Sequence, residues 1–288
     1  MANEIAVADT TIVARDGYAL AATVYEPERP WRATLLSSAT AVPRKIYRAF
    51  ATFLAENGFA VLTYDYRGIG GSRPKSLKGF EARMRDWASL DVSAAIDHAQ
   101  RRWPTVPLTY VGHSFGGQAL GLVPNNNVIT RALLVSAQAA YWRQMPTPEN
   151  YRAYAMMTFG SRVIGPLFGY VPGWTGIGED MPKGVFAEWT RWVKKPRYFF
   201  DDRTLPELAN FARYKGPLRA VGLNDDPWAT PQMIELLASG FTNAWIERRQ
   251  IDPRVLGVAK IGHFGFFRPE HRNTLWRDSV DWLGASNA

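Results

Sequence analysis

One serine stands in a sequence pattern that could make it a nucleophile. Ser114 is the third residue of Gly112-His113-Ser114-Phe115-Gly116, which fits G-x-S-x-G. An apolar run, LTYV, precedes this stretch, and a segment of helical pattern, QALGLV, follows it. A strand that turns sharply into a helix crowds the serine backbone, so small residues are needed two positions before and after it. The context predicts an outward-pointing hydroxyl at a helix N-terminus, which favours developing negative charge.

A serine hydroxyl is a poor nucleophile at neutral pH and needs a base, which is normally histidine. The chain has four histidines, His98, His113, His263 and His271. His98 falls inside a predicted helix, His113 is in an extended segment where successive side chains point to opposite faces, and His271 lies among charged residues typical of an exposed helix start. His263 follows the last predicted strand in a glycine-flanked loop, GHFGF. We predict that His263 is the general base.

The segments around these residues alternate between strand and helix patterns. Short β-rich runs at 10–15 and 19–25 flank Asp16-Gly17, which predicts an antiparallel hairpin. Further strands are expected at 33–38, 60–66, 108–114, 131–138, 217–225 and 243–251, and helices at 45–57, 84–102, 231–239 and 271–283. This alternation predicts an α/β fold with a mostly parallel central sheet, right-handed crossovers and helices on both faces.

The composition changes between the strands expected at 131–138 and 217–225. Residues 139–213 are rich in Trp, Tyr, Phe, Met and Pro and show no clear strand pattern. We interpret this stretch as an inserted, largely helical cap. The core domain then consists of residues 1–138 and 214–288.

A third residue, a carboxylate, should orient the imidazole and stabilise its charged form. In the chain order Ser, Asp, His it belongs after the strand that follows the cap. Two aspartates stand there, in the segment GLNDDPWATP at 222–231. We prefer Asp225, which lies at the strand end, and keep Asp226 as the alternative, because its position before Pro227 also suits a residue that braces the turn.

Acyl transfer also requires two backbone N–H groups that bind a negatively charged oxygen. One belongs to the residue after the nucleophile and the other to the loop after the third strand. These positions are Phe115 and Thr40. Because the backbone supplies the donor, the side chain of Thr40 is expected to matter little.

Together these residues resemble the α/β-hydrolase superfamily, in particular a bacterial branch of predicted α/β hydrolases. The resemblance covers nearly the whole chain. It implies a Ser-Asp-His triad and the α/β-hydrolase fold, and it specifies no substrate. The matching segments are DYRGIGGS at 65–72, GHSFGG at 112–117, DDPW at 225–228 and GHFG at 262–265. The sequence departs from many relatives at Ser38-Ala39, where a His-Gly pair is common, and at Ala41, where glycine is common, and both departures concern the oxyanion loop.

The resemblance also implies that the cap roofs the active site, so its composition bears on the substrate. The many aromatic residues favour an apolar acyl group, and we predict hydrolysis of a small-molecule carboxylic ester through an acyl-enzyme. The same triad could cleave an amide, a thioester or a lactone, or act as an acyltransferase. A non-catalytic binding protein of the same fold is the alternative from another class.

The composition argues against several other kinds of site and partner. There are no cysteines, which excludes disulfides, zinc–thiolate sites and a cysteine nucleophile. No P-loop or H-E-x-x-H pattern occurs and no G-x-G-x-x-G opens a helix, so we expect neither a metal nor another cofactor. The 34 Lys and Arg residues exceed the 26 Asp and Glu residues, but they are dispersed, so nucleic acid is not an expected partner.

The N-terminal sequence has neither a basic segment nor a continuous apolar stretch of the kind found in signal peptides. No run approaches the roughly 18 apolar residues of a spanning helix. We therefore expect a cytoplasmic protein without stable membrane insertion, and the sequence leaves its oligomeric state open.

Overall fold

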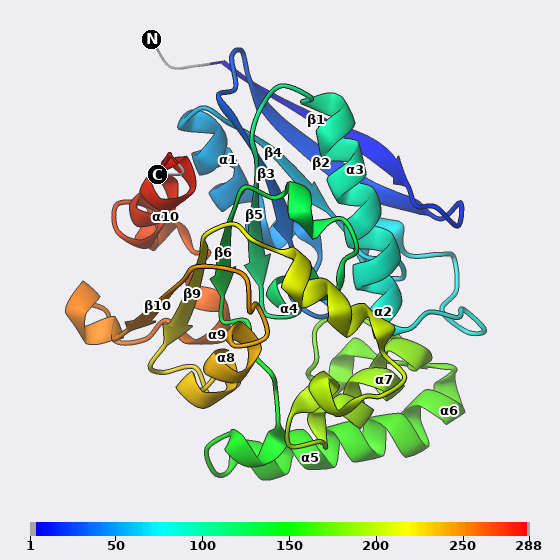
Figure 1. The fold of residues 1–288 in the computed structure, drawn as a ribbon. Helices are drawn as coiled ribbons and strands as arrows, with labels where there is room; N and C mark the ends of the chain where they lie inside the picture. The colour runs from blue at the N-terminus through cyan, green and yellow to red at the C-terminus, as the bar shows by residue number, and fades with distance from the viewer. Residues whose placement is uncertain (1–3, 287–288) are drawn as a thin grey trace.

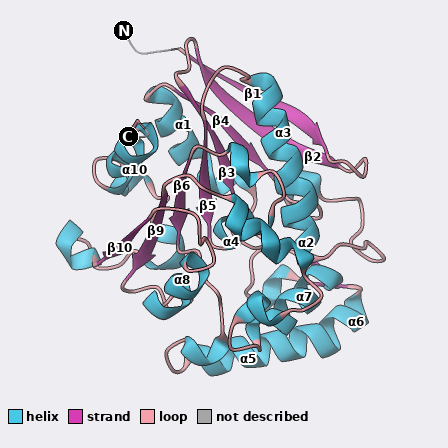
Figure 2. Ribbon diagram, viewed as in Figure 1, coloured by secondary structure: helices cyan, strands magenta, loops and turns pink. Residues whose placement is uncertain are grey.

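An eight-stranded sheet forms the centre of the computed structural model, which describes residues 4–286 (Figure 1). Its strands are β1 (Ile5–Val13), β2 (Ala19–Pro27), β3 (Arg32–Ser37), β4 (Phe59–Tyr64), β5 (Leu108–His113), β6 (Arg131–Val135), β9 (Leu218–Leu223) and β10 (Ile246–Ile251). Their order across the sheet is β1-β2-β4-β3-β5-β6-β9-β10. The β1–β2 and β2–β4 pairs are antiparallel and the others are parallel (Figure 2). The predicted hairpin and mostly parallel sheet are confirmed.

Helices cover both faces of the sheet because its central strands are apolar on both sides. On β3, Leu35 packs into one hydrophobic cluster and Leu36 into the other, and on β5 the same holds for Tyr110 and Val111. The cluster around Leu36 is closed by α1 (Arg48–Glu56) and α10 (Leu275–Gly284), and the opposite cluster by α3 (Ser93–Arg102), α4 (Phe115–Leu122) and α8 (Pro231–Ala238). Figure 1 shows α1 and α10 across the sheet from α3.

The helix expected at 84–102 is present but changes its geometry along its length. α2 (Met84–Asp86) passes into a π-helical turn at Trp87–Val92 and then into α3. This turn buries Asp91, which forms an ion pair with Arg67 at 2.7 Å, and Arg67 also pairs with Asp16 at 2.6 Å. These contacts fix the start of the glycine-rich loop that follows β4.

Residues 139–213, called the insertion below, contribute no strand to the eight-stranded sheet. They include α5 (Glu149–Phe159), α6 (Gly165–Phe168) and α7 (Lys183–Val193), which lie together beyond one end of the sheet (Figure 1). This stretch also contains one short strand pair among the described residues, in which β7 (Tyr170–Val171) pairs antiparallel with β8 (Met181–Pro182). Two residues per strand are too few to leave an alternating pattern in the sequence.

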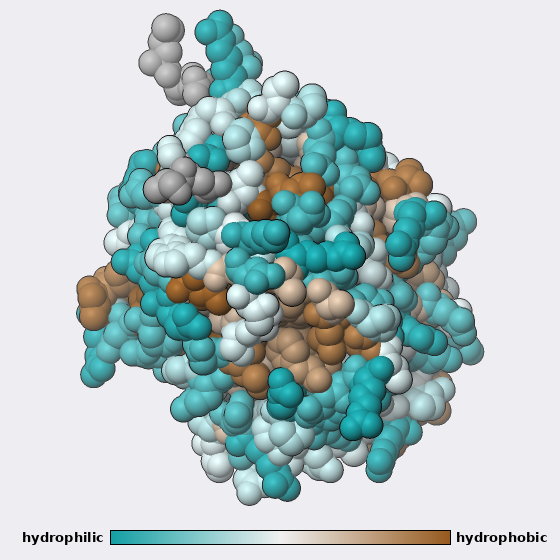
Figure 3. Space-filling view, viewed as in Figure 1, coloured by the Kyte–Doolittle hydropathy of each residue, from teal (hydrophilic) through white to brown (hydrophobic). Residues whose placement is uncertain are grey.

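Hydrophilic residues cover most of the face in Figure 3, while hydrophobic residues gather near its middle. None of the helices formed by residues 4–286 is both long enough and apolar enough to cross a bilayer. His271, which we expected at an exposed helix start, is only 1% exposed, because the turn at Pro269–His271 directs this side chain inward before α10 begins.

Candidate active site

Ser114 lies at a sharp turn between β5 and α4, with φ 51° and ψ −116°. A positive φ at a residue with a side chain costs on the order of 1–3 kcal/mol, so the surrounding structure must hold it in place. The glycines allow this conformation. A Cβ on Gly116 would lie 2.2 Å from the carbonyl oxygen of Ser37, and one on Gly112 would lie 2.5 Å from the amide nitrogen of Gly117. The turn therefore requires glycine at both outer positions of the pattern.

Strained residues gather at the carboxyl ends of three neighbouring strands. Ala41, Ser114 and Ser136 follow β3, β5 and β6 and have φ of 56°, 51° and 49°. In residues 4–286 the one other non-glycine residue with positive φ is Tyr198. Backbone strain of this kind clusters at functional sites, and ligands of open α/β sheets bind outside the carboxyl ends of the strands. Both arguments place the candidate site at this edge.

One aspartate orients the imidazole of His263. His263 lies in the short helix α9 (Gly262–Gly265), and its Nδ1 is 2.7 Å from Oδ2 of Asp226. An ionised carboxylate only accepts hydrogen bonds, so Nδ1 carries the proton and Nε2 can accept one. Burial alone would raise the pKa of Asp226, but the charge and hydrogen bond of His263 outweigh it, and the pKa is lowered. Asp226 therefore stays ionised and sets the imidazole tautomer.

The structure corrects our choice of Asp225 as the partner of His263. Oδ2 of Asp225 instead accepts hydrogen bonds from the backbone amides of Ile261, at 2.8 Å, and Gly262, at 2.9 Å. Asp225 thus holds the backbone of the loop that carries His263, while Asp226, the alternative, contacts the imidazole itself. Adjacent side chains leave the backbone in different directions, and the sequence does not say which of the two faces the histidine.

Ser114 and His263 line one cavity of about 350 Å³, a volume at the small end for ligand sites. The core contributes Ala39, Thr40, Ser114, Gln138, Trp228, His263 and Phe264 to its lining, and the insertion contributes Gly176, Ile177, Gly178 and Trp189. Within residues 4–286 no hydrogen bond joins the Ser114 hydroxyl to the His263 ring, whose Nδ1 is bonded to Asp226. Catalytic hydrogen bonds often tighten only when substrate binds.

The two backbone amides expected to bind an oxyanion have no acceptor among residues 4–286. Thr40 lines the cavity, and its amide donates to no group in the described part of the chain. Phe115 is the first residue of α4, where an amide has no acceptor within the helix, and it makes no backbone hydrogen bond outside the helix. Both amides are therefore available to a ligand oxygen. No group of three or more His, Asp or Glu residues within 4–286 could hold a metal ion.

Known proteins share this architecture. The family described as serine aminopeptidase, S33, matches residues 43–170, which include the turn at Ser114 and end before Asp226 and His263. The esterase Pf2001 of Pyrococcus furiosus is 16% identical, with a TM-score of 0.59 over 97% of this chain and 94% of its own. The esterase EaEST of Exiguobacterium antarcticum is 12% identical, with a TM-score of 0.61 over 96% of this chain and 99% of its own. The chain has the α/β-hydrolase fold.

A lipase in its open form has the same fold as this chain, at 16% identity and a TM-score of 0.64 over 97% of this chain and 98% of its own. No curated protein sequence matches the chain. Identities this low establish the fold alone. The substrate must therefore be argued from the site itself.

A chain of buried hydrogen bonds joins three loops of the protein: the loop after β3, the turn after β5 and the loop that carries His263. The amide of Ala39 donates to the Tyr47 hydroxyl at 2.9 Å, and this hydroxyl is 2.7 Å from Nδ1 of His113. Nε2 of His113 is 2.8 Å from the carbonyl oxygen of His263, which can only accept. Burial, followed by the charge of His263, lowers the pKa of His113 to about 3, so the ring is neutral and its proton is on Nε2. Tyr47 therefore donates to Nδ1.

Sequence reasoning gave no role to two residues of this region. Tyr47 was part of a predicted helix, and Gln138 was the last residue of a predicted strand. His113, which was expected in an extended segment with its side chain directed away from Ser114, is fully buried. Alternation along β5 correctly indicated that His113 points away from Ser114, but no local pattern indicates its contact with the carbonyl of His263.

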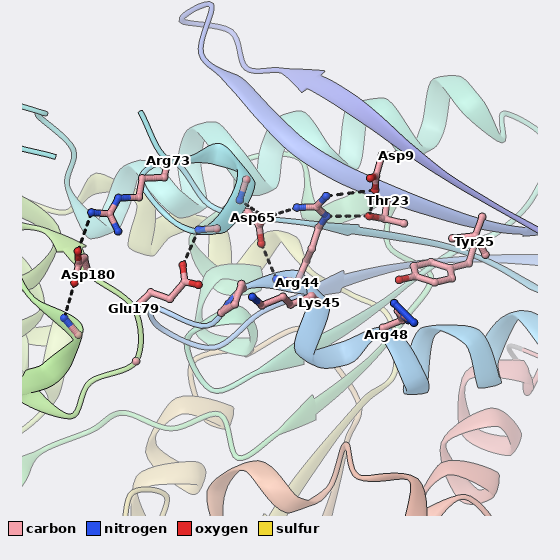
Figure 4. Close-up of a pocket in the computed structure, with 16 residues that line it drawn as sticks. Asp9, Thr23, Tyr25, Arg44, Lys45, Arg48, Asp65, Arg73, Glu179 and Asp180 are labelled. Carbon is pink, nitrogen blue, oxygen red and sulfur yellow. Dashed lines mark hydrogen bonds and ion pairs between the residues drawn. The ribbon is translucent and has the colours of Figure 1, made fainter. Parts of the chain in front are cut away.

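Figure 4 shows residues that line a larger cavity, of about 810 Å³. Gly178 lines both this cavity and the smaller one. On the core side of the larger cavity, Asp65 accepts from the Arg44 amide at 2.6 Å and pairs with the Arg44 guanidinium. Arg44 also pairs with Asp9 at 3.3 Å. The described residues that line this cavity include no serine, cysteine or histidine, so it lacks a nucleophile–base pair of the kind found in the smaller cavity.

The acidic residues on the other side of this larger cavity attach the insertion to the core. Glu179 accepts a hydrogen bond from the amide of Gly70 at 2.9 Å, and Asp180 pairs with Arg73 at 2.7 Å (Figure 4). The backbone amide of Glu179 also donates to the carbonyl oxygen of Ala41 at 2.9 Å. These contacts hold residues 173–180 over the loop after β3, beside the smaller cavity.

Proposed function

We propose that this α/β hydrolase is a serine hydrolase that cleaves a small carboxylic ester through an acyl-enzyme. One observation carries the proposal. Ser114, at a strained turn, and His263, oriented by an ionised Asp226, line the same small cavity. A nucleophile, an oriented base and room for a substrate are what acyl transfer requires. The esterases and the lipase of similar fold agree with this proposal.

In the proposed acylation step, the Ser114 oxygen attacks the ester carbonyl carbon while Nε2 of His263 takes the hydroxyl proton. The new C–O bond gives a tetrahedral intermediate, whose negative oxygen accepts hydrogen bonds from the amides of Thr40 and Phe115. The bond to the leaving alkoxide then breaks, and the imidazolium gives its proton to that oxygen. Asp226 stabilises the imidazolium between these two transfers without taking the proton.

Water completes the proposed cycle. His263 takes a proton from water as the water oxygen attacks the acyl carbon, and the bond from this carbon to Ser114 breaks in the second tetrahedral intermediate. The serine oxygen recovers the proton, and a carboxylic acid leaves. An alcohol or amine in place of water would give acyl transfer by the same steps. Product analysis with added alcohol distinguishes the two reactions.

The lining of the smaller cavity favours an ester over a peptide with a free amino terminus. Recognition of an α-ammonium group in a partly buried site calls for a carboxylate. The described residues that line this cavity include no Asp or Glu, and Asp226 already accepts from His263. Ile177, Trp189 and Trp228 supply apolar walls instead. We therefore infer an uncharged acyl group.

The same lining supports the interpretation of the insertion as a cap. Gly176, Ile177, Gly178 and Trp189 all border the cavity that holds Ser114. The insertion therefore supplies part of the wall against which a substrate would pack. The division of the chain into a core of residues 1–138 and 214–288 and a cap of residues 139–213 stays a prediction, as does the cytoplasmic location.

A fluorophosphonate probe tests the proposed nucleophile directly, because it reacts with activated serine hydroxyls. We expect labelling of the wild-type protein, no labelling of Ser114→Ala, and hydrolysis of p-nitrophenyl butyrate by the wild type alone. Circular dichroism should show that the variant is folded. An unlabelled wild type, or equal labelling of the two proteins, would overturn the proposal.

A further inference from the structure

Gln138 is a buried amide in the wall of the smaller cavity. The side chain is 3% exposed and lines the cavity that holds Ser114. Its Oε1 has no hydrogen-bond donor within residues 4–286. A buried amide without a partner destabilises the fold, so its presence in this wall needs an explanation.

The backbone on either side holds Gln138 in place. It follows β6, and the preceding Ser136 donates its amide to the carbonyl oxygen of Val221 at 2.8 Å. The amide of Ala139 donates to the carbonyl oxygen of Met233 at 2.9 Å. These bonds fix the segment at the carboxyl edge of the sheet, so the side chain is presented to the cavity from a rigid position.

Two other buried amides use their donors, although Oδ1 of Asn126, like Oε1 of Gln138, has no partner within residues 4–286. Nδ2 of Asn126 donates to the carbonyl oxygens of Leu120 and Asn210, both at 2.9 Å, and Nδ2 of Asn210 donates to that of Leu122 at 2.9 Å. These two side chains cross-link helices and turns, and Gln138 makes no comparable contact with the described residues. Its position in the wall of a cavity indicates that a ligand supplies the missing partner.

The chemistry of the wall restricts what that ligand can be. Apart from His263, none of the described residues around this cavity has an acidic or basic side chain, and the walls include Ile177, Trp189 and Trp228. A charged ligand group would lose its hydration here without an opposite charge to replace it. An amide side chain offers one acceptor and one donor group. A neutral group that both donates and accepts, such as a hydroxyl or an amide, satisfies it.

We propose that Gln138 is a specificity-determining residue that hydrogen-bonds a neutral hydroxyl or amide group carried by the ester substrate. The inference rests on the proposed function and adds the substrate class: a compact, uncharged ester with one polar group in an otherwise apolar body. A site built around such a bond rejects the analogue that lacks the polar group, because the buried amide is then left unpaired.

Matched pairs of esters test this class of substrate. Methyl 3-hydroxybutyrate and methyl 3-methylbutyrate differ by a hydroxyl in place of a methyl group on the acyl side, and 2-hydroxyethyl butyrate and propyl butyrate differ in the same way on the alcohol side. We expect the wild type to prefer the hydroxylated member of at least one pair by about tenfold or more in kcat/KM. The pair that shows the preference identifies the side of the ester that reaches Gln138.

Gln138→Met keeps the length of the side chain and removes its hydrogen-bonding groups. We expect this variant to lose the preference, to hydrolyse the methyl analogue as fast as the wild type or faster, and to be no less stable on heating. Gln118→Met is the matched control: Gln118 is 2% exposed, its Oε1 also has no partner, and it does not line this cavity. It should keep the wild-type preference.

The outcomes separate this inference from the proposed function. If the fluorophosphonate labels Ser114 and simple esters are hydrolysed, but the wild type discriminates in neither pair, a water molecule satisfies Gln138 and the inference is wrong. An unchanged preference in Gln138→Met also overturns it. If Ser114 is not labelled, the proposed function fails first.

Discussion

Nε2 of His113 donates a hydrogen bond to the carbonyl oxygen of His263 at 2.8 Å. The residue that precedes the candidate nucleophile therefore positions the backbone of the candidate base. The same ring accepts from Tyr47, whose hydroxyl also accepts from the amide of Ala39, the neighbour of the candidate oxyanion donor Thr40. One buried chain thus connects three loops whose relative positions decide whether acyl transfer is possible.

Tyr47→Phe should impair turnover more than substrate binding. The change removes the acceptor of the Ala39 amide and the donor to His113, and it leaves two buried polar groups without partners. We expect kcat to fall by about tenfold or more with KM nearly unchanged, because misplaced catalytic groups act mainly on the transition state. The free energy of unfolding should fall by about 1–3 kcal/mol.

Tyr214→Phe is the control for a loss of stability alone. The Tyr214 hydroxyl donates to the carbonyl oxygen of Pro217 at 2.8 Å and belongs to no part of the candidate site. Urea denaturation and steady-state kinetics on both variants give the comparison. Equal effects of the two substitutions on kcat would show that the Tyr47 chain has no role in positioning.

The burial of His113 should make stability depend on pH. Burial lowers its pKa in the folded protein to about 3, against about 6.5 for an ordinary histidine, so the unfolded chain binds the proton first. The contribution of His113 is therefore fully present above pH 6.5 and is lost as the pH falls from 6.5 toward 3. In this range the contribution of His113 to the free energy of unfolding falls by about 1.4 kcal/mol for each pH unit.

His113→Gln removes this titration and keeps a polar side chain. Urea denaturation at several values between pH 7 and pH 5 should give a shallower loss of stability for the variant, by about 1.4 kcal/mol per unit below pH 6.5. Burial raises the pKa of the Asp91 carboxyl to about 7, so this group also titrates in the same range, but it does so in both proteins and only the difference between their curves reports on His113. Parallel curves for the two proteins would contradict the neutral, buried state of His113.

The two adjacent aspartates should respond differently to substitution. Asp226→Asn removes the charge that keeps the proton of His263 on Nδ1. We expect kcat to fall by about 10⁴-fold, as it does in other triads when the histidine takes the wrong tautomer. Asp225→Asn keeps an oxygen for the Ile261 and Gly262 amides and should cost far less. Steady-state kinetics on both variants measure the difference. A larger loss in Asp225→Asn would reverse the assignment.

Much of the architecture follows from patterns local to the chain. The apolar runs of the central strands, the Asp16-Gly17 turn and the glycines around Ser114 each specify a conformation by sterics or burial. The sequence predicts small residues at Gly112 and Gly116 because the turn is crowded, and in the structure a Cβ at either position would clash with the backbone. For the same reason the position of Ser114 could be predicted without a structure.

The features that could not be predicted depend on contacts between distant segments. Asp225 and Asp226 are chemically identical neighbours, and the choice between them depends on where the loop at 261–263 packs. The burial of His113 against Tyr47 and His263 joins residues 66 and 150 positions apart. No periodicity or motif encodes such pairings, because each is decided by packing after the elements have formed.

The volume of the smaller cavity predicts a preference for short esters. A water molecule occupies roughly 30 Å³ in the liquid. The cavity, at about 350 Å³, therefore has room for about a dozen groups of that size. We expect kcat/KM for p-nitrophenyl esters to rise from acetate toward butyrate, as apolar burial increases, and to fall by at least tenfold by palmitate. Trp189→Ala removes a large side chain from the wall that the insertion supplies, so the optimum should move to longer chains. A flat profile in the wild type, or an unmoved optimum in the variant, would show that this cavity does not receive the acyl group.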